Sequence, residues 1–176
     1  MAPNDGAVPQ VIPPGGEALW FLGTFTQVKL DAAATGGRLG AAEVLAPHGA
    51  APPLHSHPQD ETFYVLDGEI TAWLVDVADT ADTAWVAEAA RRCGPGAMVY
   101  APGGTPHTFR VESDSARILV LSTPGGIEDY MRGLSEPAAW PWLPPPPDGP
   151  RVSAERMAEV EERLGFVRHG PPPPPA

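Results

Sequence analysis

Three side chains that can bind a metal lie close together within residues 49–68: His55, His57 and Glu61. Successive side chains of a strand alternate between its two faces, so His55 and His57 are expected on the same side. A further imidazole, His107, follows a proline- and glycine-rich turn later in the chain. Three imidazoles and one carboxylate suit a borderline divalent metal, and these donor types leave iron, nickel, cobalt, manganese, copper and zinc as candidates.

Other residues that could bind a metal have no further potential ligands at a suitable spacing in the sequence. An isolated histidine is more often a surface or core residue than a ligand, and this is our interpretation of His48 and His169. Asp60 has the opposite strand parity to Glu61, so we expect its carboxylate in solvent. Cys93 is the only cysteine, which excludes an internal disulfide, and we interpret it as an inert small hydrophobe.

Composition limits the classes of function. The chain has 176 residues, 43% of them hydrophobic, and a net charge of −11. This length suits one domain, and the negative charge makes nucleic acid and anionic membranes poor partners. No signal peptide and no apolar run long enough to span a membrane is recognised, so we expect a cytoplasmic protein.

The elements that would position the metal-binding side chains are short strands separated by glycine and proline. We expect strands at Ala18–Leu30 (one or two, broken at Gly23), Arg38–Leu45, Glu61–Val65, Glu69–Val75, Ala84–Ala90, Met98–Ala101, His107–Glu112 and Ala116–Ser122. Asp67-Gly68 predicts a type I′ hairpin turn between two of these strands. Many short strands with such turns are typical of a barrel or a sandwich.

The C-terminal part changes character. Residues 126–134 have apolar side chains at helical spacing. Ser153 is a predicted N-cap and Gly165 a predicted end for a second helix, which carries Met157 and Val160 on one face. We interpret both helices as a cover on the barrel. The predicted organisation is an extended arm at 1–16, a β-barrel at 17–123, a helical and proline-rich cover at 124–170 and a disordered tail at 171–176.

Both metal-binding stretches resemble the two motifs of the cupin family. The first motif is matched by Gly49, five residues, His55, one residue, His57, three residues, Glu61, six residues and Gly68. The second is matched by Gly96, five residues, Pro102, one residue, Gly104, two residues and His107. Val111 replaces the closing Asn of the second motif and Ala97 replaces its frequent Asp. The Asn is not a metal ligand in the family.

The resemblance covers residues 38–123 and implies an all-β fold, a single cupin (jelly-roll) barrel with a short C-terminal helical extension. It implies that His55, His57, Glu61 and His107 converge on one divalent transition metal inside the barrel. It also implies a homodimer. Together with residues 122–138 after the last strand, the motifs are similar to the single-domain bacterial quercetin 2,3-dioxygenase-like group. In that group the metal binds a flavonol hydroxyl and oxygen inserts into the heterocycle.

The first hypothesis for function is therefore a metal-dependent dioxygenase that takes a small aromatic substrate and dioxygen. Glu61 would be a ligand and also the base that removes a substrate proton. Phe63, Phe109, Tyr100 and Trp73 are candidate walls for a flat substrate, with packing in the barrel core as the alternative. Two other hypotheses remain: a non-oxidative isomerase, cyclase or decarboxylase, and a non-catalytic module that binds a metal or small molecule.

Overall fold

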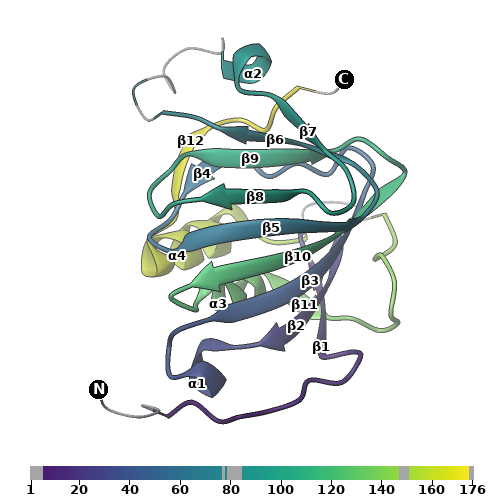
Figure 1. Cartoon of the computed structure of the whole chain (residues 1–176), viewed down its shortest axis with the longest axis vertical. Helices are drawn as coiled ribbons and strands as arrows, with labels where there is room; N and C mark the ends of the chain where they lie inside the picture. The colour runs from purple at the N-terminus through teal and green to yellow at the C-terminus, as the bar shows by residue number, and fades with distance from the viewer. Residues whose placement is uncertain (1–5, 77, 79–84, 147–150, 175–176) are drawn as a thin grey trace.

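Two antiparallel sheets form the body of the structure, a computed structural model that describes residues 6–76, 78, 85–146 and 151–174 (Figure 1). Within these residues the larger sheet has seven strands in the order β11-β1-β2-β3-β10-β5-β8, and the smaller has five in the order β12-β4-β9-β6-β7. Apolar side chains of both sheets, such as Val65, Ile118, Ile70 and Val111, meet in one buried cluster. The core therefore lies between the sheets.

The bounds of the elements follow in chain order. The strands of the larger sheet are β1 (Glu17–Phe21), β2 (Thr24–Leu30), β3 (Gly40–Pro47), β5 (Asp60–Asp67), β8 (Met98–Ala101), β10 (Ser115–Thr123) and β11 (Ser135–Pro137). Those of the smaller sheet are β4 (Leu54–Ser56), β6 (Ile70–Leu74), β7 (Arg91–Cys93), β9 (His107–Val111) and β12 (Val167–Gly170). The helices are α1 (Ala32–Thr35), α2 (Trp85–Glu88), α3 (Ile127–Gly133) and α4 (Ala154–Leu164).

Strand alternation on β5 orients its side chains as expected. Glu61, Phe63 and Val65 are buried, whereas Thr62 and Tyr64 between them are partly exposed. The period of two places the Glu61 carboxylate on the same face as the apolar core residues. β5 is paired on both sides, with β10 and with β8, which holds that face in place.

The predicted hairpin at Asp67-Gly68 is wrong. β5 belongs to the larger sheet and β6 to the smaller, so at this point the chain crosses between sheets. Gly68 has φ 78°, and a Cβ there would lie 2.3 Å from the carbonyl oxygen of Ser115, so only glycine fits this corner. A two-residue hairpin turn with positive φ at both positions occurs instead at Leu22-Gly23 (46° and 92°), between β1 and β2.

The strand predicted over Ala84–Ala90 is also wrong. α2 occupies Trp85–Glu88, and strand β7 begins only at Arg91, while Ala84 lies outside the described residues. Alanine and glutamate favour helix over strand, and here this local preference decides the structure.

The two predicted C-terminal helices are confirmed. In α4 the Ser153 hydroxyl accepts a hydrogen bond from the Arg156 amide at 3.2 Å, and Gly165 ends the helix with φ 73°. α3 and α4 pack against each other on one side of the molecule (Figure 1). The same C-terminal part supplies β11, which pairs with β1, and β12, which pairs with β4. It therefore extends both sheets in addition to covering them.

The ends of the chain also contact the sheets. Lys29 donates to the carbonyl of Gly15 in the predicted N-terminal arm at 2.6 Å, and Arg110 donates to the carbonyl of Pro174 in the predicted tail. The rest of that tail, residues 175–176, lies outside the described residues, and the proposed domain boundaries stay predictions. No helix in the described ranges is long and apolar enough to cross a bilayer.

Candidate metal centre and cavity

The structure brings the four candidate ligands together from three strands. His55 lies on β4, His57 directly follows β4, Glu61 is the second residue of β5 and His107 is the first of β9. β4 and β9 pair with His55 opposite His107. One donor atom from each of the four residues lies within 4.8 Å of the other three.

Hydrogen bonds orient the rings of two histidines. Nδ1 of His55 donates to the carbonyl of Pro53, and Nδ1 of His107 donates to the carbonyl of Thr105, each at 2.8 Å. Such a bond on Nδ1 fixes the ring and turns Nε2 toward the cluster, where it can coordinate a metal after losing any proton that it carries. Nε2 of His107 lies 2.8 Å and Nε2 of His57 3.1 Å from Oε2 of Glu61.

Burial and mutual charge shift the pKa values of the site. Burial lowers the pKa of His55 to about 4, so its imidazole is neutral at pH 7. Burial alone would raise the pKa of Glu61, but hydrogen bonds from His107 and His57 outweigh it and lower that pKa. Burial alone would lower the pKa of His107, but its hydrogen bond to Glu61 raises that pKa. Glu61 is therefore a carboxylate at neutral pH, the form that binds metals.

These residues fit a single transition-metal ion. Bonds of about 2.0–2.2 Å place ligand atoms up to roughly 4.4 Å apart, so a donor set within 4.8 Å needs only a small adjustment. Nδ1 of His57 is buried and has no hydrogen-bond partner among the described residues, while Nε2 of the same ring faces Glu61. The donor set does not choose among the candidate metals.

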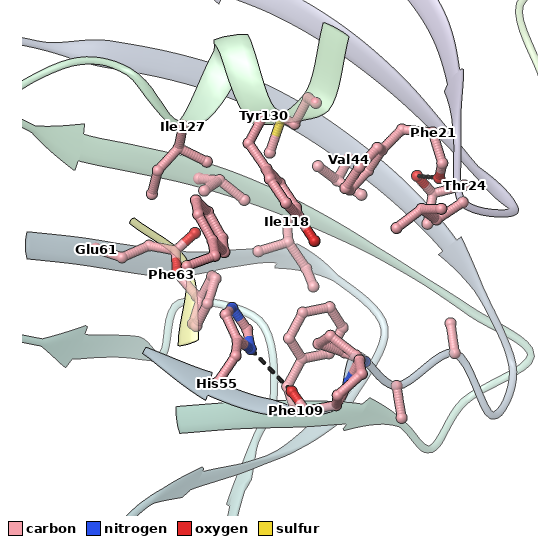
Figure 2. A pocket seen from close by; sticks show the side chains of 18 of the residues that line it. Phe21, Thr24, Val44, His55, Glu61, Phe63, Phe109, Ile118, Ile127 and Tyr130 are labelled. Carbon is pink, nitrogen blue, oxygen red and sulfur yellow. Dashed lines mark hydrogen bonds between the residues drawn. The ribbon is translucent and has the colours of Figure 1, made fainter. Parts of the chain in front are cut away.

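An apolar cavity of about 340 Å³ opens onto this cluster. His55 and Glu61 are the two candidate ligands that line it, and Figure 2 shows both beside Phe63 and Phe109. The other apolar walls are Phe21, Leu22, Val44, Ala50, Ala51, Pro52, Pro53, Ile118, Val120, Ile127, Met131, Met157 and Phe166. The volume suits a small organic molecule, and the walls suit an apolar or aromatic one.

Two of the four candidate wall residues do not reach this cavity. Phe63 and Phe109 line it, with ring centroids 5.5 Å apart. Trp73 is 2% exposed, packs in a separate cluster with Leu54, and lies under the guanidinium of Arg110. For Trp73 the structure therefore supports the alternative given in the sequence analysis, packing in the core.

Tyr100 lies on the outer surface of the larger sheet. It is 52% exposed, and its hydroxyl donates to Asp60 at 2.8 Å. Asp60 also accepts a hydrogen bond from the amide of Gly103, so its carboxylate points away from the metal cluster. Tyr100 therefore has no contact with the cavity, because even and odd residues of β8 face opposite sides.

Sequence reasoning missed the part of the cavity that the C-terminal helices build. Tyr130 of α3, Glu161 of α4, and Phe166 and Arg168 beyond it all line the cavity. Phe166 is stacked on Tyr130, with centroids 3.8 Å apart, and lies parallel to His55 at 5.8 Å. The apolar spacing of α3 was the available signal, but helical spacing does not distinguish packing from a cavity wall.

Comparison with known proteins agrees with this architecture. Residues 42–123 match the family model described as "Cupin domain". Quercetin 2,3-dioxygenase of Bacillus subtilis is 27% identical over 135 residues, 76% of this chain and 36% of that protein. Dimethylsulfoniopropionate lyase DddQ of Ruegeria pomeroyi is 34% identical over 83 residues, 47% of this chain and 36% of that protein. The chain thus spans about a third of the length of each relative.

The solved structure of oxalate decarboxylase from Bacillus subtilis shares the fold, with a TM-score of 0.52, 16% identity, and coverage of 77% of this chain and 34% of that one. Fold and site together define an antiparallel β-barrel with a candidate His/Glu metal centre. Residues 42–123 are thus similar to a cupin domain, and the predicted all-β jelly-roll class is confirmed.

Proposed function

We propose that this protein is a metal-dependent dioxygenase of the quercetinase-like type, which oxidatively cleaves a flavonol or a related enolisable aromatic substrate. The observation that carries the proposal is the position of the four-donor cluster at the wall of an apolar cavity of about 340 Å³. A cluster that served structure alone would be closed by side chains, whereas this one meets open space at His55 and Glu61.

His55, His57, Glu61 and His107 would hold the metal. A divalent ion bound there supplies a Lewis acid with one or two open coordination positions. The surrounding barrel keeps the site dry, since His57, Glu61 and His107 are buried.

Glu61 would also receive the proton of the substrate hydroxyl. It is a carboxylate at neutral pH and lines the cavity, so its side chain meets both the other ligands and the bound substrate. Phe63 and Phe109 would hold the ring system of the substrate between them and the cover.

Distant relationship supports the oxidative class. The similarity to quercetin 2,3-dioxygenase extends over 76% of the chain, beyond the metal motifs. An enolisable aromatic substrate also agrees with the apolar walls, because a strongly charged substrate would find few polar partners on them.

An oxygen electrode tests the proposal. Protein loaded in turn with nickel, iron, manganese, cobalt, copper and zinc is given quercetin and other flavonols, and we expect oxygen uptake that requires metal. The Glu61→Gln variant should lose this uptake. Complete turnover of the same substrate under strict anaerobiosis would refute the oxidative class.

A second candidate is a non-oxidative enzyme on the same site. It is favoured by the 34% identity to a dimethylsulfoniopropionate lyase over 83 residues. Metal-dependent turnover without oxygen, by elimination, isomerisation, cyclisation or decarboxylation, would support it. A ligand recovered unchanged after long aerobic incubation with metal-loaded protein would instead indicate a binding module.

A further inference from the structure

The polar groups of the cavity fall into separate sets. His55 and Glu61 belong to the metal cluster, and Thr24 is engaged with its own hairpin, where it donates to the carbonyl of Phe21. The remaining polar lining residues, Tyr130, Glu161 and Arg168, all come from the C-terminal cover. The cover therefore contributes its own polar groups to an otherwise apolar wall.

Glu161 and Arg168 form an ion pair with several hydrogen bonds. Nε of Arg168 donates to Oε1 of Glu161 at 2.9 Å, and Nη2 donates to the same oxygen at 2.7 Å. The pair is neutral as a whole, and its charge-assisted bonds leave little capacity to recruit a charged ligand. Of the three cover residues, the Tyr130 hydroxyl is thus the group best placed to bond a ligand.

The position of Tyr130 is set by its neighbours. Phe166 stacks on one ring face with planes 7° apart, and Phe21 meets it edge-on with centroids 5.8 Å apart. Figure 2 shows the ring extending from α3 into the cavity, toward the side where His55 and Phe109 lie. A ring held in this way presents its hydroxyl in a fixed direction.

The hydroxyl is a hydrogen-bond donor with two neighbouring acceptors, the thioether of Met157 and the carboxylate of Glu161. The structure gives it a contact to Sδ of Met157 at 4.0 Å, and a thioether sulfur accepts weakly. Burial and the neighbouring carboxylate of Glu161 raise the pKa of Tyr130, so the phenol stays protonated throughout the working pH range. A ligand oxygen in the cavity would be a better acceptor than the sulfur. Glu161 keeps its hydrogen bonds from Arg168 when the Tyr130 hydroxyl turns to the ligand.

We infer that Tyr130 is a substrate-binding residue, whose hydroxyl donates a hydrogen bond to an oxygen of an aromatic substrate held in the cavity. The inference rests on the proposed aromatic substrate class but not on oxygen chemistry. The ligand would be a flat, neutral molecule with a ring carbonyl or hydroxyl oxygen. It would contact the metal cluster through one oxygen and the cover through Tyr130, so Tyr130 selects for oxygen-bearing ring systems over hydrocarbons of the same shape.

Binding to the metal-free, full-length protein tests this assignment, by fluorescence titration with two probes. 3-Hydroxyflavone carries a ring carbonyl and a hydroxyl, and 2-phenylnaphthalene has a similar shape without oxygen. In Tyr130→Phe, which keeps the ring that stacks on Phe166, we expect 3-hydroxyflavone to bind about three- to tenfold more weakly. The affinity for 2-phenylnaphthalene should stay the same or rise.

Tyr64→Phe is the matched control. Tyr64 lies on the outer face of β5 and does not line the cavity. Its substitution removes the same group, one phenolic hydroxyl. It should leave both affinities unchanged.

Equal weakening of both probes in Tyr130→Phe, or no weakening of either, would overturn the assignment. So would failure of the unmodified protein to bind 3-hydroxyflavone. Metal-loaded protein that shows the expected binding pattern but consumes no oxygen would remove the dioxygenase proposal and leave the role of Tyr130 standing.

Discussion

At the scale of single residues, the proposed chemistry centres on Glu61. Its carboxylate is buried, accepts hydrogen bonds from His57 and His107, and reaches the cavity wall. The neighbouring Asp60 has the same functional group but is bonded to Tyr100 on the outer surface. Two adjacent carboxylates thus have different roles because strand alternation sends them to opposite faces.

Glu61→Gln should weaken metal binding by at least about tenfold, since a neutral amide replaces the charged ligand of the cluster. Metal content after equilibrium dialysis, measured by mass spectrometry, checks this. Asp60→Asn removes a charge one residue away and should keep full metal content. Equal loss of metal in both variants would show that net charge, rather than ligation, is responsible.

Trp73→Phe should lower the free energy of unfolding by about 1–3 kcal/mol, because the indole is buried and stacked under Arg110. Metal binding and ligand binding should not change, since Trp73 packs away from the cavity. Chemical denaturation and ligand titration on the same sample measure the two effects. A selective loss of ligand affinity at unchanged stability would restore Trp73 as a wall residue.

At the scale of elements, pairing between strands decides which side chains meet. β4 and β9 are neighbours in the smaller sheet, which sets His55 against His107 across 52 positions of sequence. In the larger sheet β3 lies between β2 and β10, and Glu43 of β3 bonds both Lys29 of β2 and Arg117 of β10. This charge cluster links three consecutive strands on the outer face.

Glu43→Gln should destabilise the protein by about 0.5–1 kcal/mol at pH 7. Burial alone would raise the pKa of Glu43, but Arg117 and Lys29 lower it below its ordinary value of 4.5. A lowered folded-state pKa stabilises the protein above pH 4.5 and loses that effect as the pH falls through the folded-state value. The difference between variant and parent should therefore shrink on acidification below pH 4.5.

Urea unfolding at several pH values measures this difference, with exposed Glu162→Gln as the control. A difference at Glu43 that stays constant from neutral to acidic pH would show that the effect does not come from its charge.

At the scale of the whole molecule, the C-terminal part completes the site that the barrel begins. β12 pairs with β4, the strand of His55, and Phe166 just before it contacts the rings of both His55 and His57. The cavity consequently has barrel strands on one side and the cover on the other (Figure 2). A homodimer stays a prediction, which light scattering of the purified protein tests.

Phe166→Ala should remove the ring that covers His55 and His57. We expect a loss of about 1–3 kcal/mol in unfolding free energy and faster removal of bound metal by a chelator, because solvent reaches His55 and His57 more easily. Val167→Ala alters the next residue, which is 52% exposed, and should change neither quantity. Unchanged chelation kinetics in Phe166→Ala would show that the cover does not control access.

Local information was sufficient for several elements and for part of the candidate site. Strand parity predicted that His55 and His57 share a face, whereas the convergence of Glu61 and His107 with them was predicted by the resemblance to the cupin motifs. The caps Ser153 and Gly165 predicted α4, because capping residues act over a few positions.

Only the tertiary structure decided how distant segments meet. It showed that Gly68 turns the chain between two sheets rather than within a hairpin, because the carbonyl of Ser115 occupies the space beside it. It separated Phe63 and Phe109, which line the cavity, from Tyr100 and Trp73, which do not. It also placed Phe166 beside His55 and Tyr130 on Phe166, because β12 pairs with β4 across 111 positions of sequence (Val167 opposite Ser56) and α3 packs against α4.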